Sequence, residues 1–208
     1  NVVIDKGYGS PMVTKDGVIK KTPIADFQNI RRTGIIAIAL KKGDALRWVR
    51  ISGGHDEIVL ATSRGQAIRF KESQIRAMGR SASGVRAIRL KKDDSVAGFD
   101  VVKSGKASAE QKLLVVMANG FAKQTFLKQY KVQNRGGSGI KTAKITPKTG
   151  KIVSSHVIAE ETEIFALSAK GQVIRTALQG VRMTGRAAQG VRIMHMKGGD
   201  RLAGVVVI

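Results

Sequence analysis

The segment VVMANGFAKQT, residues 115–125, is one copy of a unit that occurs four times and decides the fold of this chain. The other copies are MVTKDGVIKKT from Met12, VLATSRGQAIRF from Val59 and FALSAKGQVIRT from Phe165. Their turn glycines, which lie 48, 55 and 51 residues apart, are Gly17, Gly65, Gly120 and Gly171. A period of roughly fifty residues indicates a repeat architecture, in which each unit buries its apolar surface against its neighbours.

A second glycine follows the first in every copy, after 17 residues in copy one and after 19 residues in the other three. These second glycines are Gly34, Gly84, Gly139 and Gly190. The longest spacing is explained by KSGKASAEQ, residues 103–111, a polar stretch of small residues that is typical of a flexible connector. We therefore place this stretch outside the repeat.

Short apolar runs flank the first glycine of each copy, and Asp16 or Asn119 precedes it in two of them. Asp-Gly and Asn-Gly are strong signals for a tight hairpin, because a type I′ turn needs positive φ at both central residues. The second glycine opens another run, such as VRAIRL (85–90), which is followed by KKDD and then VAGFDVV (96–102). We interpret these runs as a second hairpin in each copy.

Four strands in about fifty residues are typical of a propeller blade, and the chain shows no long helical periodicity. The sequence therefore predicts an all-β, propeller-like array of about four four-stranded blades with little helix. The predicted blades span approximately residues 12–52, 57–102, 111–158 and 162–208. Residues 1–11 precede them and are expected to contain an extra N-terminal strand, Val2 to Ile4.

The charge of the chain is strongly unbalanced, with 37 Lys and Arg against 15 Asp and Glu, a formal charge of +22 over 208 residues. Such a field favours a polyanion, because every phosphate that a cation neutralises releases condensed counterions. A membrane surface is a weaker candidate, since the chain has no amphipathic helix, lipidation signal or long apolar stretch. A hydrophobic content of 42% is enough to build a core. Duplex DNA is thus the leading partner.

Basic residues recur at equivalent positions of the copies. Four residues after the first glycine come Lys21, Arg69 and Arg175, with Lys123 beside that position in copy three, and four residues before the second glycine come Arg80, Arg135 and Arg186. A propeller would carry them as a curved positive belt. The DNA-binding candidates are Lys20, Lys21, Arg31, Arg32, Arg69, Lys71, Arg80, Arg86, Lys123, Lys128, Arg135, Lys141, Arg175, Arg186 and Arg192. The alternative is that they are ordinary solubilising residues on outward-facing positions.

The aromatic content of only 4% narrows the mode of binding. Single-strand binders stack bases on aromatic side chains, whereas phosphate contact with a duplex needs none and reads no bases directly. We therefore expect duplex binding with weak sequence preference, any bias coming from how easily the DNA bends.

Catalytic and metal sites find little support. The chain has no Cys, its three His are far apart, and no nucleotide-binding fingerprint occurs. Tyr130 aligns with Phe27 of copy one and is interpreted as a packed blade residue, not as a strand-cleaving tyrosine. We therefore expect no catalytic residue, no metal and no cofactor in this chain.

Copy three carries QNRGGSG, residues 133–139, which resembles the glycine-rich "gyrase box" of the C-terminal domain family of the DNA gyrase A protein. The box pattern is roughly Q, basic, R, G, G, basic, G, and five positions agree: Gln133, Arg135, Gly136, Gly137 and Gly139. Asn134 and Ser138 stand where the pattern has basic residues. Segments 18–38, 68–90 and 184–193 are also similar to later blades of that family.

This resemblance implies a β-pinwheel, in which neighbouring blades exchange strands and DNA wraps around the basic perimeter. It implies a monomeric, non-catalytic domain that supports negative supercoiling in the bacterial cytoplasm, with the rest of gyrase A and gyrase B as partners. A degenerate box in the third copy suggests the last four of six blades. Its glycines would let backbone N–H groups approach a phosphate, or would serve only a tight turn between blades.

Two other functions stay open from the sequence. The chain could belong to the related subunit of topoisomerase IV, whose C-terminal blades steer the choice of DNA substrate. It could also be a propeller that binds an acidic protein partner without touching DNA, since fold alone does not settle function.

Overall fold

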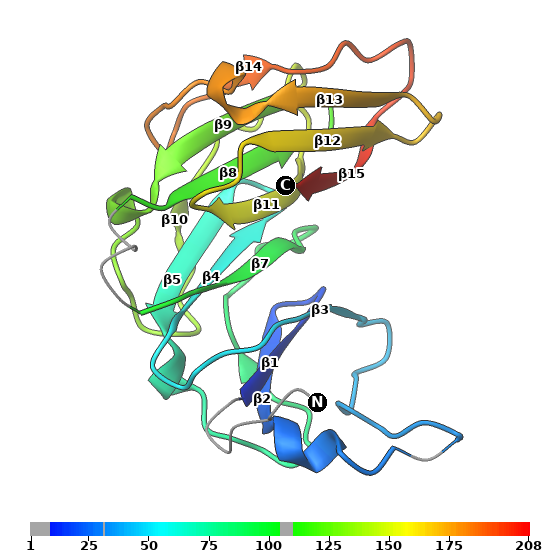
Figure 1. The fold of residues 1–208 in the computed structure, drawn as a ribbon, viewed down its shortest axis with the longest axis vertical. Helices are drawn as coiled ribbons and strands as arrows, with labels where there is room; N and C mark the ends of the chain where they lie inside the picture. The colour runs from blue at the N-terminus through cyan, green and yellow to red at the C-terminus, as the bar shows by residue number, and fades with distance from the viewer. Residues whose placement is uncertain (1–8, 31, 105–109) are drawn as a thin grey trace.

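Four antiparallel sheets follow one another along the chain and form a crescent (Figure 1). The computed structural model describes residues 9–30, 32–104 and 110–208. The expected strand Val2 to Ile4 and part of the 103–111 connector lie outside the described residues. Strand β1 begins at Gly9, so three residues that were expected to precede the first blade belong to it.

Each sheet forms one blade of the crescent, with its strands in the following spatial order. Blade 1 contains β3 (Leu46–Val49), β1 (Gly9–Thr14), β2 (Val18–Pro23) and β6 (Val85–Arg86). Blade 2 contains β10 (Ile140–Lys141), β5 (Gln66–Lys71), β4 (Glu57–Thr62) and β7 (Val96–Val102). Blade 3 contains β11 (Ile152–Ile158), β8 (Lys112–Met117), β9 (Phe121–Phe126) and β14 (Val191–Arg192). Blade 4 contains β13 (Val173–Ala177), β12 (Glu163–Ser168) and β15 (Leu202–Val207).

The helical content of the described chain is confined to short 3₁₀ turns after the second strand of each hairpin. They are η1 (Ile24–Phe27), η2 (Glu72–Gln74), η4 (Leu127–Gln129) and η5 (Leu178–Gly180). The prediction of an all-β fold with little helix is therefore confirmed.

The first hairpin of each copy forms as the sequence predicts. Strands β1 and β2 pair antiparallel, as do β4 with β5, β8 with β9, and β12 with β13. All four turn glycines have positive φ, between 79° and 87°. The hairpins and their glycines are therefore confirmed, but the type I′ turn is wrong, because neither Asp16 nor Asn119 has positive φ.

The predicted second hairpin is wrong. Strand β6 does not pair with β7 but with β2 of the preceding blade, while β7 pairs with β4 of its own blade. Strands β10 and β14 likewise complete the sheets of the blades before them. The strand exchange implied by the family resemblance is thus confirmed. Blade 4 has three strands within the described chain.

The second glycine of copies two to four lets the exchanged strand meet its neighbour. Gly84 and Gly139 have φ of 86° and 70°, and a Cβ added to them would lie 2.7 Å and 2.5 Å from the carbonyl oxygens of Ile19 and Ala67. A side chain cannot occupy that space without moving the backbone. Glycine is therefore required where the chain crosses from one blade to the next.

The hydrophobic core lies between consecutive blades instead of inside one sheet. Along β8, Leu113 and Val115 pack in the cluster shared with blade 2, whereas Leu114 and Val116 pack in the cluster shared with blade 4. Alternate residues of a strand point to opposite faces of its sheet, so an apolar run buries both faces. Each blade consequently depends on its neighbours for stability.

The exchanged-strand glycines lead to a stability prediction. Gly139→Ala should lower the free energy of unfolding by about 3 kcal/mol, because it combines a positive φ with a backbone clash. Gly34→Ala is the matched control, since Gly34 has φ of 76° but no atom within 4 Å of the added Cβ; it should cost about 1 kcal/mol. Urea unfolding measures both, and equal losses would contradict the proposed close approach.

Candidate nucleic-acid interface

The exchanged strands present one basic side chain each to solvent. Arg86, Lys141 and Arg192 are the second residues of β6, β10 and β14, and all three are exposed. The first residue of each strand is half-buried, so the period-two alternation of a strand turns the basic residue outward. Strand exchange thus places a cation at the same edge position of three successive sheets.

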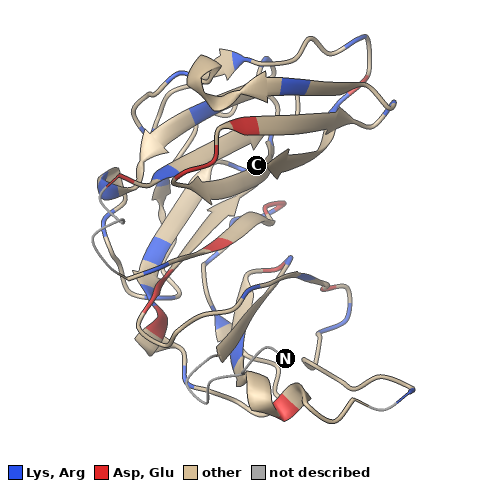
Figure 2. Cartoon of the chain, viewed as in Figure 1, with Lys and Arg blue, Asp and Glu red and all other residues tan. Residues whose placement is uncertain are grey.

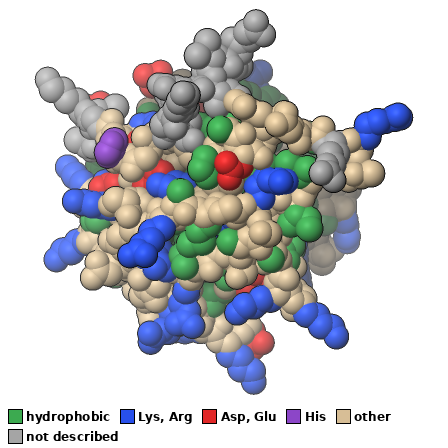
Figure 3. All heavy atoms as spheres, turned by 90° about the horizontal axis from the view of Figure 1, so that it is seen from below, with side chains coloured by type: hydrophobic (Ala, Val, Ile, Leu, Met, Phe, Trp, Pro, Cys, Tyr) green, Lys and Arg blue, Asp and Glu red, His purple; other side chains and the backbone are tan. Residues whose placement is uncertain are grey.

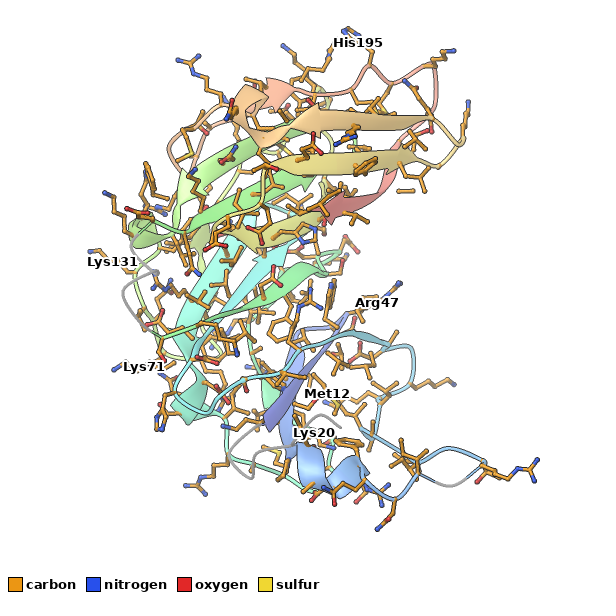
Figure 4. All side chains as sticks on the ribbon, in the orientation of Figure 1. Met12, Lys20, Arg47, Lys71, Lys131 and His195 are labelled. Atoms are coloured by element: carbon orange, nitrogen blue, oxygen red, sulfur yellow. The ribbon has the colours of Figure 1, made fainter. Side chains whose placement is uncertain are left out.

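Lys and Arg residues occur along the convex outline of the crescent and also on the loops at its open side (Figure 2). Of the predicted contacts, Arg32, Lys71, Lys128 and Arg175 are also exposed. Lys71 and Lys131 project outward from the convex side, near the 3₁₀ turns (Figure 4). Viewed from the blade 1 end, Lys and Arg side chains radiate around the margin of a face with hydrophobic groups nearer its middle (Figure 3).

Sequence reasoning missed two repeated basic positions. Arg76, Lys131 and Arg182 each lie eleven residues after the first glycine of their copy, and all three are exposed. Arg89 and Lys144 each lie five residues after the second glycine and are exposed as well. Aligning the copies at every position, and not only near the glycines, would have found both sets.

The residue four positions after the turn glycine, in contrast, joins neighbouring blades. The Lys21 ammonium forms a 3.0 Å ion pair with Glu72 of blade 2, a carboxylate that is fully buried. Glu72 also accepts a 2.6 Å hydrogen bond from Ser52 Oγ and a 3.1 Å bond from the Gly54 amide. The carboxylate therefore links the end of the first blade to the second.

Arg69 and Gln124 make the equivalent contacts at the next two junctions. Arg69 donates to Leu127 O of blade 3 at 2.9 Å and to Glu57 at 2.6 Å, and Gln124 Nε2 donates to the carbonyls of Leu178 and Val181 of blade 4. Arg175 has no following blade in this chain and is exposed. The expectation that Lys21 and Arg69 contact DNA is corrected, because their cationic groups are engaged between blades.

The expectation for Lys20 and Lys123 is corrected for a stronger reason, since both side chains are fully buried. Lys20 Nζ donates to Ala37 O at 2.6 Å and to Arg80 O, and Lys123 Nζ donates to Thr142 O, Gly185 O and Arg186 O at 2.6–2.7 Å. A buried ammonium that already has carbonyl partners is not available to a phosphate.

Burial and neighbouring cations disfavour the charged form of both lysines. Desolvation, together with a smaller contribution from the neighbouring Arg186 cation, lowers the pKa of Lys123 to about 8. Desolvation also lowers the pKa of Lys20, where Asp26 acts in the opposite direction and Arg80 in the same one. Among the residues that the structure describes, neither ammonium forms an ion pair with a carboxylate, and carbonyl dipoles stabilise both.

Metal ligation and membrane insertion find no support in residues 9–30, 32–104 and 110–208. No group of three His, Asp or Glu side chains there could hold a metal ion. No helix in these segments is long and apolar enough to cross a membrane.

Comparison with known proteins assigns the chain to a family. A sequence model of the family described as "DNA gyrase C-terminal domain, beta-propeller" matches residues 12–52, 56–103, 111–159 and 162–208. These segments cover most of the chain. The chain belongs to the DNA gyrase C-terminal domain family.

A relative in this family is the gyrase A protein of Staphylococcus epidermidis, which is 38% identical over 195 residues. That match covers 94% of this chain but 22% of the relative, so the chain spans less than a quarter of the relative's length. Two solved structures share the fold: a DNA gyrase A C-terminal domain (24% identity, TM-score 0.87) and a topoisomerase IV C-terminal domain (21%, 0.91). This chain is covered fully in both and spans 68% and 64% of those chains.

The gyrase-box-like segment of this family member forms a junction between blades 2 and 3. The Gly136 amide donates to Ala87 O at 2.8 Å, and the Arg135 guanidinium donates to Gln74 O at 3.2 Å and to Arg86 O. Gly139 is the close-packed glycine of the exchanged strand. The expectation that the Gly136 N–H meets a phosphate is corrected in favour of the interblade turn.

Other members of the predicted set have mixed positions. Asn134 and Ser138 of the box-like segment are exposed, while Gln133 and Gly137 are half-buried. Arg80 and Arg186 are also half-buried, and Arg31 lies outside the described residues. Tyr130 is 1% exposed and shares a 2.6 Å hydrogen bond with Thr142 Oγ1, which confirms its interpretation as a packed residue.

The buried ammonium of Lys123 leads to a pH prediction. Its pKa is about 8 in the folded chain and 10.5 ordinarily, so between these values the unfolded chain binds the additional proton and stability rises with pH. The stability of the wild type relative to Lys123→Met should therefore increase from pH 8 to pH 10.5, by up to about 3 kcal/mol. Urea unfolding across this range measures it. Ile68→Met, an uncharged change at the same position of blade 2, controls for packing, and a pH-independent difference would contradict the prediction.

Proposed function

We propose that this chain binds duplex DNA along its convex edge and bends or wraps it, as a non-catalytic domain of a DNA gyrase A protein. The observation that carries the proposal is the repeated exposed cation on the exchanged strands: Arg86, Lys141 and Arg192. In this role the domain supports negative supercoiling in the bacterial cytoplasm, together with the rest of gyrase A and gyrase B.

The acidic residues support this proposal because many of them are used inside the molecule. Glu72 and Glu57 pair with Lys21 and Arg69 at blade junctions. Asp94 accepts hydrogen bonds from Ser63 Oγ and the Arg64 amide in a turn, and Asp200 accepts one from the Lys170 amide. Few carboxylates are left to balance the exposed cations, so the outer edge keeps a strong positive potential.

The arrangement of the cations suits a backbone that follows a curve. Successive blades present equivalent side chains, so phosphates along one bent duplex can meet the same residue type at each blade. Phosphate contacts hold the position of a duplex but do not read its sequence. Sequence preference would then come from the cost of bending, which flexible steps lower.

The curated relative favours gyrase over topoisomerase IV, since the 38% identical protein is a gyrase A protein. The fold alone does not separate the two, because the solved C-terminal domains of both enzymes superimpose on this chain. An acidic protein partner would use the same positive surface. Competition between duplex DNA and a polyglutamate peptide distinguishes that possibility.

Arg86, Lys141 and Arg192, the exposed cations of the exchanged strands, are called the belt cations below. Their removal should weaken duplex binding in a salt-dependent way. The triple variant Arg86→Ala, Lys141→Ala, Arg192→Ala should lose about 10- to 100-fold in affinity at about 0.1 M salt, and the slope of log K against log salt should fall by about 2 to 3. Fluorescence anisotropy with a labelled duplex measures both quantities.

The control for this experiment removes the same charge from exposed turns away from the exchanged strands, through Arg64→Ala, Lys92→Ala and Lys170→Ala. If the belt is the contact surface, this control loses much less affinity than the belt triple. Equal losses would show that the overall charge binds DNA without a defined path.

Wrapping is tested separately from binding by ligating nicked circular DNA in the presence of the chain. Directional wrapping should change the mean linking number with one sign, in proportion to the protein bound, and the belt triple should abolish the change. Symmetric broadening, or no change at saturating protein, would leave binding without wrapping and would overturn that part of the proposal.

A further inference from the structure

Two kinds of blade junction alternate along the chain. The residue three positions after the turn glycine is Lys20, Ile68, Lys123 and Ile174 in blades 1 to 4. The loop that precedes the second glycine of the following blade changes with it: GRSASG (79–84) follows Lys20, NRGGSG (134–139) follows Ile68, and GRAAQG (185–190) follows Lys123. A lysine is thus followed by the GR-type loop, and an isoleucine by the RGG-type loop.

The two lysine junctions have the same geometry. Lys20 donates to Ala37 O, and Lys123 donates to Thr142 O, each acceptor lying three residues after the second glycine of the same copy. Both lysines also donate to the arginine carbonyl of the next loop, Arg80 O or Arg186 O. Each ammonium therefore connects the segment after the second glycine of its own copy to the arginine loop of the next blade, and at Lys123 that segment directly follows the exchanged strand β10.

At the isoleucine junction the loop backbone supplies the hydrogen-bond donor that the lysine supplies at the other two junctions. The equivalent carbonyl, Ala87 O, accepts the Gly136 amide at 2.8 Å, and Gly136 adopts a φ of 84° as it donates. The corresponding residues of the lysine junctions are Ser81 and Ala187, and neither has positive φ. The same carbonyl acceptor is satisfied once by a backbone amide and twice by an ammonium.

The loops also hold the proposed DNA contacts. Arg135 donates to Arg86 O and Arg186 donates to Lys141 O at 3.3 Å, so these two loop arginines hold the backbone of the exposed cation on the preceding exchanged strand. A shift of the loop would move two positive charges together, the arginine and its partner.

We propose that Lys20 and Lys123 are positioning residues, which set the conformation of the next blade's arginine loop, and that Lys123 thereby also sets the placement of Lys141, the exposed cation that contacts this loop through its backbone. The residue three positions after the turn glycine selects the loop type: lysine for the GR-type loop and isoleucine for the RGG-type loop. The first claim rests on the proposed function, whereas the pairing of residue and loop is independent of it.

The test is a double-mutant cycle at the junction of blades 3 and 4. The first change is Lys123→Ile. The second is a loop exchange, Gly185→Asn, Ala187→Gly, Ala188→Gly and Gln189→Ser, which converts this loop into the one that follows Ile68. Lys123→Ile alone should lower the melting temperature by about 5 °C or more, because three carbonyls lose their donor. The loop exchange alone should also lower it, and the combination should recover to within about 2 °C of the wild type.

Duplex affinity gives the second readout. Lys123→Ile should weaken binding by about 3- to 10-fold although no exposed cation is removed, and the combined variant should recover. Arg186→Ala provides the reference for loss of the loop cation, and Lys170→Ala controls for loss of one exposed charge.

The outcomes separate the two claims. Additive melting-temperature losses, with no recovery in the combined variant, would overturn the pairing of residue and loop. If the combined variant recovers its stability but folded Lys123→Ile binds duplex DNA as tightly as the wild type, the lysine stabilises the junction only. That result would overturn its positioning role. If the wild type does not bind duplex DNA, the proposed function is rejected. The melting temperatures of the double-mutant cycle would still test whether residue and loop type are paired.

Discussion

The structure depends on the passage of a short strand from each blade into the sheet of the blade before it. That passage requires backbone to lie against backbone at Gly84, Gly139 and Gly190, where a side chain would collide with a carbonyl group. Because the exchanged strand completes its neighbour's sheet, no internal blade has a complete set of strands of its own. Stability is therefore shared along the array, as in other repeat proteins.

The same exchange places part of the positive charge of the chain in solvent. Short exchanged strands turn one residue inward and the next outward, so Arg86 and Lys141 stand at the sheet edge in solvent. The cations that remain inside are held individually. Lys21 and Arg69 pair with carboxylates across and beside the junctions, and Lys123 is surrounded by three carbonyls.

The box-like segment illustrates how one motif can serve architecture and function together. Its glycines permit the turn between blades 2 and 3, and Arg135 fixes the backbone of an exposed cation on the neighbouring strand. A contribution of this segment to DNA binding would therefore act through the placement of Arg86 as well as through its own exposed residues, Asn134 and Ser138.

The sequence by itself determined the repeat, the first hairpin of each blade, the all-β class and the excess of positive charge. These properties follow from local turn chemistry, strand periodicity and composition. Only the tertiary structure decided where the second run of each copy pairs, since a short strand such as Val85–Arg86 carries no local signal for its partner. Burial likewise separated Lys20 and Lys123 from Arg86 and Lys141, because a lysine in a strand looks the same in sequence whether carbonyls or water surround its ammonium.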